Sequence, residues 1–258
     1  MHYLDQGGPE GPALLLIHGF PFDSSMWEPQ ISALRDKYRV IAPDLRGHGA
    51  SSAPEGVYSM ELLAEDLRRL LDHLKTKRVI LGGLSMGSYI AFAFYRKYAE
   101  LVRALILADT RPQADTPEGQ KAREDLAQLA TNEGSRAVAE RLLPRLLTEP
   151  TREHNNLVVR WVNYMIQNTS IQGLVGALRG MAQRADSTDL LPQISVPTLI
   201  LVGERDILTP PADAQRMAEL IPGARLEIIP EAGHLSNLEN PQEFNRILRE
   251  FLDSLPKP

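Results

Sequence analysis

Residues 82–88 have the sequence GGLSMGS, in which Ser85 has one glycine two positions before it and another two positions after it. An apolar run that ends at Leu81 comes directly before this stretch, and a helical pattern over 86–98 follows it. A strand that turns at once into a helix strains the residue between them, and only small neighbours permit this geometry. The pattern therefore predicts a sharp turn that lifts the Ser85 hydroxyl clear of a sheet as a nucleophile.

Short apolar runs alternate with helical patterns along most of the chain. This alternation is typical of a mostly parallel sheet with helices on both faces, so we predict an α/β fold. The predicted strands are Ala13–Ile17, Arg39–Ala42, Val79–Gly82, Ala104–Ala108, Thr198–Val202 and Leu226–Ile229. The predicted helices are Ser24–Leu34, Met60–Leu74, Met86–Tyr98, Ala212–Leu220 and Pro241–Leu252.

The alternation stops between Arg111 and Leu191. Polar turns there, such as Asn132–Gly134, separate helical patterns, and no strand-like run is found. Apolar residues recur at helical spacing in two stretches: Leu157, Trp161, Tyr164 and Met165, then Ile171, Leu174, Val175, Leu178 and Met181. We therefore expect residues 111–190 to form a helical cap, inserted into a core made of residues 1–110 and 191–258.

The composition argues against a highly charged partner. The 258 residues include 28 basic and 33 acidic side chains, for a net charge of −5, and there is no large basic cluster. We therefore expect neither nucleic acid nor a membrane surface as a partner. The first residues lack the features of a signal peptide, which makes the cytoplasm the expected location. The absence of cysteine excludes disulfides, thiolate metal sites and a cysteine nucleophile.

A serine hydroxyl needs a base that removes its proton, so Ser85 predicts a histidine and an acid elsewhere in the chain. His234 is the favoured base. It lies between the strand predicted at 226–229 and the last predicted helix, which puts it on a loop at the carboxyl edge of the sheet, as Ser85 is. His18 and His48 are harder to dismiss than the remaining histidines.

Two aspartates could orient the histidine. Asp206 follows the strand predicted at 198–202 and gives the chain order serine, acid, histidine. Asp109 ends the preceding strand, one loop away. We favour Asp206, because it is nearer to His234 in this order and Asp109 can hold the junction with the cap. Glu204 is a weaker third option.

Acyl transfer also needs donors for the developing oxyanion. The backbone N–H of Met86 is one candidate, because it lies next to Ser85 at the amino end of a helix. The loop after the first predicted strand should supply the other. Pro21 has no N–H, which leaves Phe20 as the expected donor.

Five segments together resemble the α/β-hydrolase superfamily, over nearly the whole chain and in the family's order: His18–Pro21, Pro43–Ser51, Gly83–Gly87, Gly203–Asp206 and Gly233–His234. Within this superfamily the chain is similar to compact capped bacterial carboxylesterases that are close to 3-oxoadipate enol-lactonases. The resemblance implies Ser85, Asp206 and His234 as nucleophile, acid and base, and Phe20 and Met86 as the oxyanion hole. Ser88 stands where many members have glycine, and the first hairpin is expected to be incomplete.

The resemblance implies a serine carboxylesterase that hydrolyses small, short-acyl esters through an acyl-enzyme, without a metal or organic cofactor. Trp161 and Met165 are expected either to roof an acyl pocket or simply to pack the cap on the core. An enol-lactonase or a carbon–carbon bond hydrolase would use the same triad. A lactone with a carboxylate would need a cation facing Ser85, for which the candidates are Arg111, Arg160, Arg179 and Arg184. A ligand receptor on the same fold, without turnover, is a further alternative.

Overall fold

The computed structural model describes residues 1–8 and 11–256. Within these residues, seven strands form one sheet in the order β1-β3-β2-β4-β5-β6-β7. β1 runs antiparallel to β3, and every other neighbouring pair is parallel. The strands are β1 (Tyr3–Gln6), β2 (Ala13–Ile17), β3 (Arg39–Pro43), β4 (Val79–Leu84), β5 (Val102–Ala108), β6 (Thr198–Gly203) and β7 (Arg225–Ile229).

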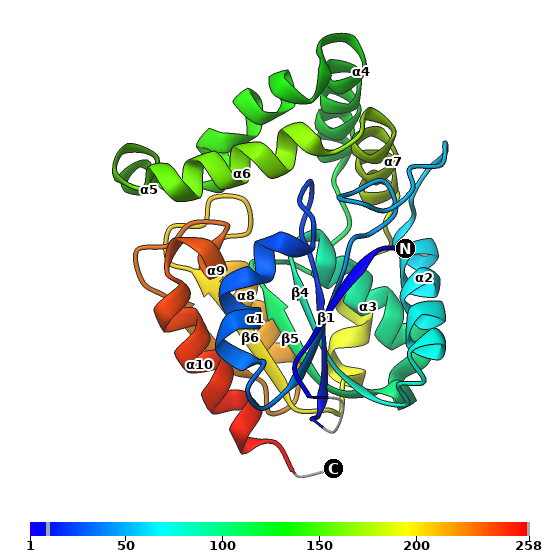
Figure 1. The fold of residues 1–258 in the computed structure, drawn as a ribbon, viewed down its shortest axis with the longest axis vertical. Helices are drawn as coiled ribbons and strands as arrows, with labels where there is room; N and C mark the ends of the chain where they lie inside the picture. Colours follow the sequence, from blue (N-terminus) through cyan, green and yellow to red (C-terminus); the bar gives the residue numbers. More distant parts are fainter. Residues whose placement is uncertain (9–10, 257–258) are drawn as a thin grey trace.

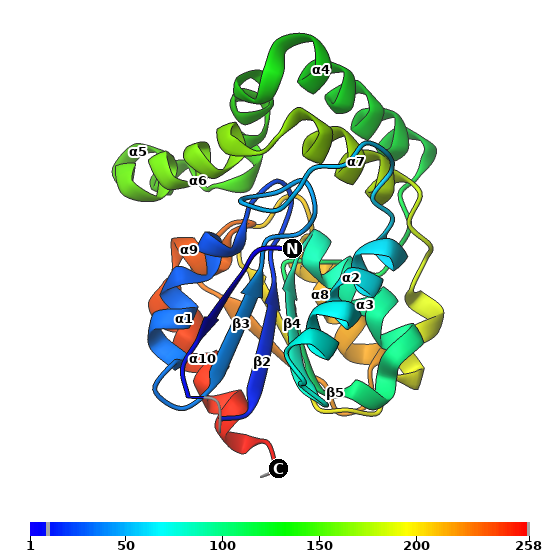
Figure 2. The same cartoon turned by 45° about the vertical axis from the view of Figure 1, so that its right-hand side comes forward.

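Helices cover both faces of the sheet (Figure 1 and Figure 2). One face carries α1 (Glu28–Leu34), α9 (Ser236–Glu239) and α10 (Pro241–Ser254), and the other carries α2 (Met60–His73), α3 (Met86–Tyr98) and α8 (Pro211–Leu220). Alternation along β2 explains both layers: Leu14 and Leu16 join the core under α1 and α10, whereas Leu15 and Ile17 join the core under α2 and α3. The predicted α/β class is confirmed. Short 3-10 helices lie at Ser24–Trp27, Ala99–Leu101 and Thr188–Gln193.

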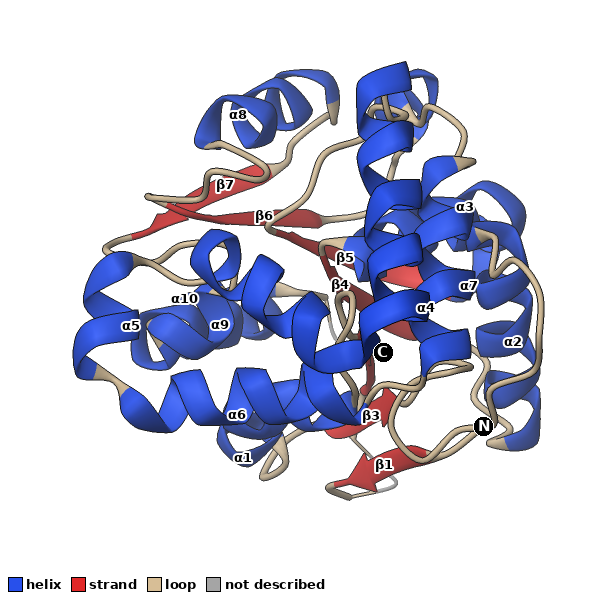
Figure 3. Cartoon of the chain, turned by 90° about the horizontal axis from the view of Figure 1, so that it is seen from above, coloured by secondary structure: helices blue, strands red, loops and turns tan. Residues whose placement is uncertain are grey.

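Four helices between β5 and β6 lie over the carboxyl edge of the sheet, as the side view and the view from above show (Figure 1 and Figure 3). They are α4 (Pro117–Leu146), α5 (Glu149–His154), α6 (Asn156–Asn168) and α7 (Ile171–Ala182). The turn predicted at 132–134 is a kink inside α4, where Gly134 has φ 84°. Leu157 and Tyr164 do not belong to the buried face of α6, because their side chains are 78% and 66% exposed.

The first strand shows where the sequence pattern was too short to interpret. β1 has only four residues and is half exposed at the sheet edge, so it lacks the apolar run that identified the other strands. It pairs with β3 rather than with β2, and residues 9–10 of the expected first hairpin lie outside the described residues. No helix in the described part of the chain has the length and apolar character needed to span a bilayer.

Candidate active site

Ser85 lies at the sharp turn between β4 and α3. Its φ of 55° and ψ of −115° are unusual for a residue with a side chain, which is the strain expected at such a turn. The two flanking glycines are required by space: a Cβ on Gly83 would lie 2.3 Å from the carbonyl carbon of Gly87, and one on Gly87 would lie 2.2 Å from the oxygen of Ile17. Ser88 adds a buried hydrogen bond from its hydroxyl to the Gly83 oxygen, at 2.6 Å, which fastens the turn.

The structure brings Ser85, His234 and Asp206 together from three separate loops. The Nε2 atom of His234 lies 2.9 Å from the Ser85 Oγ, and its Nδ1 atom lies 2.8 Å from Asp206 Oδ2. Asp206 also accepts hydrogen bonds from the backbone N–H of Leu208 and from the hydroxyl of Thr209. His234 is therefore oriented by a carboxylate that is itself held in place.

The electrostatics of this pair favour a base. Burial works against the charged imidazolium, but the carboxylate of Asp206 outweighs this effect and raises the pKa of His234 above its ordinary value. Burial also works against the Asp206 carboxylate, and the charge and hydrogen bond of His234 overcome it, so the pKa of Asp206 is lowered. Asp206 thus stabilises the positive charge that His234 gains when it takes a proton.

Asp109 and Glu204, the other two acids considered for His234, have different hydrogen-bond partners. Asp109 bonds to Gly203 and Ser236, not to the cap junction for which it was suggested. Glu204 accepts a hydrogen bond from the backbone of Glu231. Among the described residues neither carboxyl group forms a hydrogen bond with His234.

The two expected oxyanion donors are the N–H groups of Met86, which follows Ser85 directly, and of Phe20. Met86 is the first residue of α3, so its N–H has no partner within the helix. Phe20 lines the same cavity as Ser85 and His234. Neither backbone N–H makes a hydrogen bond to another residue in the described part of the chain.

A cavity of about 400 Å³ lies above Ser85, between the sheet edge and the helices α4 and α7. Its lining combines catalytic candidates, apolar side chains and charged side chains: Phe20, Ser85, Tyr89, Arg111, Asp115, Gly119, Ala122, Arg123, Leu126, Leu142, Arg145, Leu146, Leu178, Met181, Ile207, Leu208, Thr209 and His234. A substrate in this cavity would meet the Ser85 hydroxyl at its floor.

Trp161 and Met165 do not line this cavity, so the acyl-pocket role expected for them is corrected. Met165 is fully buried in the core that packs α6 against the rest of the molecule. The Trp161 indole donates a hydrogen bond to the Ser25 hydroxyl at 3.3 Å. Helical spacing identified a packed face of α6, and α4 and α7 supply the wall above Ser85.

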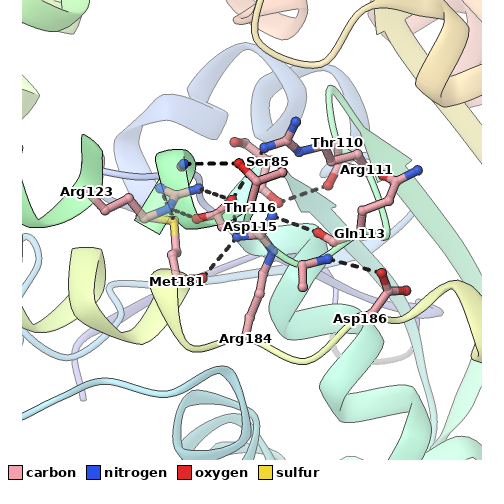
Figure 4. A network of polar contacts seen from close by, with 12 residues as sticks. Ser85, Thr110, Arg111, Gln113, Asp115, Thr116, Arg123, Met181, Arg184 and Asp186 are labelled. Carbon is pink, nitrogen blue, oxygen red and sulfur yellow. Dashed lines mark hydrogen bonds and ion pairs between the residues drawn. The ribbon is translucent and has the colours of Figure 1, made fainter. Parts of the chain in front are cut away.

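An arginine cluster around Asp115 forms the charged side of the cavity (Figure 4). Arg184 Nη1 lies 2.8 Å and Arg111 Nη2 lies 3.4 Å from Asp115 Oδ1, and Arg123 contacts the other carboxylate oxygen. Burial acts to raise the pKa of Asp115, but Arg123 and Arg184 outweigh it and lower this pKa. Because three guanidinium groups share one carboxylate, the cluster keeps a net positive charge.

Of the four arginines suggested by the sequence, only Arg111 lines the cavity. Arg184 is outside the lining, and its guanidinium group lies 4.2 Å from the centre of the Tyr89 ring. Arg179 pairs with Glu124 at the surface, and Arg160 is exposed outside the lining.

Two other arginines, Arg123 and Arg145, also line the cavity and were missed. They lie on α4, and no local pattern in the sequence says which face of that helix turns inward. The described residues contain no group of three or more histidine, aspartate or glutamate side chains arranged to hold a metal ion.

Comparison with known proteins agrees with this geometry. Residues 12–241 match the family described as alpha/beta hydrolase fold. The chain belongs to this family. The resemblance seen in the sequence motifs is therefore confirmed, and the turn at Ser85, the following helix and the loops of Asp206 and His234 all fall within the matched region of this α/β-hydrolase.

Its relatives include esterases and lactonases. A thermophilic esterase from Thermogutta terrifontis, solved with malate bound, superposes with a TM-score of 0.96 at 44% identity, over 99% of this chain and 94% of that one. The enol-lactonase from Burkholderia xenovorans superposes with a TM-score of 0.92 at 32% identity, over 98% and 96% of the two chains. The 3-oxoadipate enol-lactonase 2 of Acinetobacter baylyi is 34% identical over 98% of this α/β-hydrolase and 92% of its own length.

Proposed function

We propose that this α/β-hydrolase is a serine carboxylesterase that cleaves small, short-acyl esters through an acyl-enzyme intermediate. The observation that carries the proposal is the continuous chain of hydrogen bonds from Ser85 Oγ to His234 and on to Asp206, at 2.9 and 2.8 Å. A serine, a base and an orienting acid within this reach are the parts that acyl transfer requires.

The reaction proceeds in two steps. Ser85 attacks the ester carbonyl while His234 accepts its proton, and the oxyanion takes hydrogen bonds from the N–H groups of Phe20 and Met86. The C–O bond to the alcohol then breaks, and His234 gives its proton to the leaving oxygen. In the second step His234 takes a proton from water, the resulting hydroxide attacks the acyl-enzyme, and the carboxylic acid leaves as the proton returns to Ser85.

The cavity supports a small substrate. Its volume of about 400 Å³ is near the lower end of the range for ligand pockets, about 300–1,000 Å³. Leucines from α4 and α7 supply its apolar side, which suits a short acyl chain. The esterase from Thermogutta terrifontis, at 44% identity, supports the same assignment.

A lactonase that takes a carboxylate-bearing lactone is the second candidate, and the arginine cluster is the observation that favours it. Arg111 and Arg123 line the cavity with Ser85, and Arg145 lines it without an ion pair in the described residues. The Nε atom of Arg111 is shielded from solvent and has no hydrogen-bond partner among these residues. A guanidinium group so placed can bind a substrate carboxylate. The enol-lactonases of Burkholderia xenovorans and Acinetobacter baylyi support this candidate.

Covalent labelling tests the serine chemistry. A phosphonate ester should label Ser85 in the wild type, and Ser85→Ala should lose both the label and ester hydrolysis, with a fall in kcat of about 10⁶-fold. Ser88→Ala is the matched control, because Ser88 lies three residues away and bonds to the Gly83 oxygen. It should keep the label. Hydrolysis at the wild-type rate by Ser85→Ala would contradict the proposal.

A paired substrate assay separates the two candidates. For 4-nitrophenyl butyrate, Arg123→Gln should leave kcat/KM within about threefold of the wild type. For a carboxylated lactone, the loss of a charged hydrogen bond of about 1.5–3 kcal/mol should lower kcat/KM about 10- to 150-fold. Arg179→Gln, which removes a surface arginine paired with Glu124, should change neither value. Equal losses on both substrates would exclude the carboxylate role of the cluster.

A further inference from the structure

Asp109 is a buried carboxyl group beside the triad, and the proposed reaction gives it no role. It follows β5 directly, has a positive φ of 45° and is 0% exposed. Its Oδ1 atom accepts a hydrogen bond from the backbone N–H of Gly203 at 2.8 Å, and its Oδ2 atom lies 2.5 Å from the hydroxyl oxygen of Ser236. Gly203 precedes Asp206 by three residues and Ser236 follows His234 by two, so Asp109 joins the acid loop to the histidine loop.

The residues on either side of Asp109 hold the third loop. The oxygen of Ala108 accepts a hydrogen bond from the Ser85 N–H at 2.9 Å. The Thr110 hydroxyl donates to the Ser85 oxygen at 3.2 Å (Figure 4). Residues 108–110 therefore contact all three catalytic loops, although Asp109 is 94 residues from Gly203 and 127 from Ser236.

We propose that Asp109 is a positioning residue for the Ser85–His234–Asp206 reaction, and that its buried carboxyl group links the acid loop to the histidine loop through Gly203 and Ser236. The inference rests on the proposed function.

The surroundings favour the uncharged form. In the described residues no lysine, arginine or histidine forms an ion pair with Asp109. The charged groups that face it are Asp206 after β6 and His234 after β7, with Glu239 of α9 acting on His234. Burial and then the charge of Asp206 raise the pKa of Asp109 to about 8, against the smaller opposing effects of His234 and of the hydrogen bonds from Ser236 and Gly203.

An uncharged carboxyl group can keep both contacts. In the structure Oδ1 accepts a hydrogen bond from the Gly203 N–H, and Oδ2 accepts one from the Ser236 hydroxyl. A protonated carboxyl group keeps an acceptor oxygen and gains one O–H donor, so it holds Ser236 with the direction of that bond reversed. An asparagine has the same shape and offers the same acceptor and donor, whereas an alanine offers neither.

Steady-state kinetics on an ester test the positioning role. Asp109→Asn should keep kcat within about threefold of the wild type at pH 7. Asp109→Ala leaves both loops without their link, and because a misplacement of about 1 Å can cost about 100-fold, kcat should fall about 10- to 100-fold with little change in KM. Ser236→Ala, which removes one of the two bonds, should lie between them.

The pH dependence of melting tests the charge state. An unfolded Asp109 releases its proton near its ordinary pKa of 3.8, and the folded one near 8. The stability that it contributes is therefore complete below pH 4 and is lost progressively as the pH rises to 8. The Tm of Asp109→Asn should thus rise relative to the wild type between pH 5 and pH 8.

Asp44 offers a matched control of opposite sign. It is also buried, but it accepts backbone hydrogen bonds from Ser24 and Ala50 at 2.8 and 2.9 Å. Burial acts to raise its pKa, and these hydrogen bonds outweigh burial and lower it. Asp44 also pairs with His2 Nδ1 at 2.8 Å, so the control is measured in a His2→Ala background. There the Tm deficit of Asp44→Asn should stay constant between pH 5 and pH 8, because the carboxylate is ionised throughout.

Each outcome decides the proposal. Wild-type kcat in Asp109→Ala would remove the positioning role, and a loss in Asp109→Asn as large as in Asp109→Ala would show that the charge is needed. If Asp109→Ala does not fold, Asp109→Asn and Ser236→Ala still give the kinetic answer. Failure of the proposed function would be seen separately, as equal ester hydrolysis by the wild type and Ser85→Ala.

Discussion

Two buried histidine regions at the carboxyl edge of the sheet differ in their charge behaviour. Beside Ser85, the carboxylate of Asp206 raises the pKa of His234 in spite of its burial. In the loops after β2 and β3, the rings of His18 and His48 lie 5.0 Å apart, and burial lowers their pKa values to about 4 and about 3. Burial alone keeps a histidine neutral, and a bonded carboxylate makes it a base that can carry a proton.

The neutral ring of His18 has a structural role, because it connects two loops by hydrogen bonds. Its Nε2 atom accepts a hydrogen bond from the Leu45 N–H at 3.0 Å, so Nδ1 carries the proton and donates to the Gly19 oxygen at 2.9 Å. These bonds fix the loop that presents the Phe20 N–H. The two histidines left open by the sequence thus differ from His234 in their partners rather than in their burial.

Removing the charge of Asp206 should take away most of the basic character that distinguishes His234 from His18 and His48. Asp206→Asn leaves His234 without its counter-charge and favours the wrong tautomer, so kcat should fall about 10⁴-fold in ester hydrolysis. Asp213→Asn, on α8, is the control and should keep kcat, because Asp213 is outside the cavity lining. A loss below about tenfold in Asp206→Asn would mean that another group orients His234.

The fall of kcat/KM at low pH should also show that Asp206 makes His234 differ from His18. Since His234 must be neutral to act as a base and its pKa is raised above 6.5, kcat/KM should fall about tenfold for each pH unit below that pKa. In Asp206→Asn the burial effect remains while the attraction is lost, so the limb should move to lower pH, toward the behaviour of His18. Titration of the imidazole signals by NMR would check this shift. An unmoved His234 titration in the variant would break the comparison.

The structural histidine should affect stability. His18→Ala leaves the Leu45 N–H buried without a partner, which should lower the free energy of unfolding by at least about 1–3 kcal/mol. Denaturant unfolding measures this change. His73→Ala, at the exposed end of α2, should stay within about 0.5 kcal/mol of the wild type. Equal effects of the two substitutions would show that the His18 bonds do not hold the loop.

Phe20 should give the smallest kinetic effect, because its backbone N–H is the group assigned to the oxyanion. Phe20→Ala keeps that N–H, so kcat should stay within about threefold of the wild type, against about 100- to 1,000-fold for the loss of one oxyanion donor. KM can rise, since the ring lines the cavity. An ester assay that separates kcat from KM decides the point. A loss of 100-fold in kcat would show that the ring positions the loop.

Local pattern predicted much of the fold, as particular elements show. The run before Ser85 and the glycines around it identified β4, the turn and α3, and the alternation of apolar residues identified five further strands of the core. These features are encoded by neighbours in the chain, because strand and helix periodicities depend on residues a few positions apart. β1 was not predicted, because its four half-exposed residues do not show such a period.

The helices α4 to α7 show the limit of the same reasoning. Helical spacing marked α6 and α7, but it left Trp161 and Met165 open between the substrate cavity and core packing, and it overlooked Arg123 and Arg145. Which face of a helix lines a cavity depends on how the helices pack on one another. The spacing of residues within one helix does not contain that information.

The sequence by itself determined the alternating α/β architecture, the strained turn at Ser85 and the chain order of serine, aspartate and histidine. Only the tertiary structure decided that Asp206 rather than Asp109 meets His234, that Arg111 and Arg123 line the cavity above Ser85, and that His18 and His48 are neutral supports. The reason is physical. Each of those outcomes depends on the distance between charges and hydrogen-bonding groups that lie far apart in the chain, and folding sets those distances.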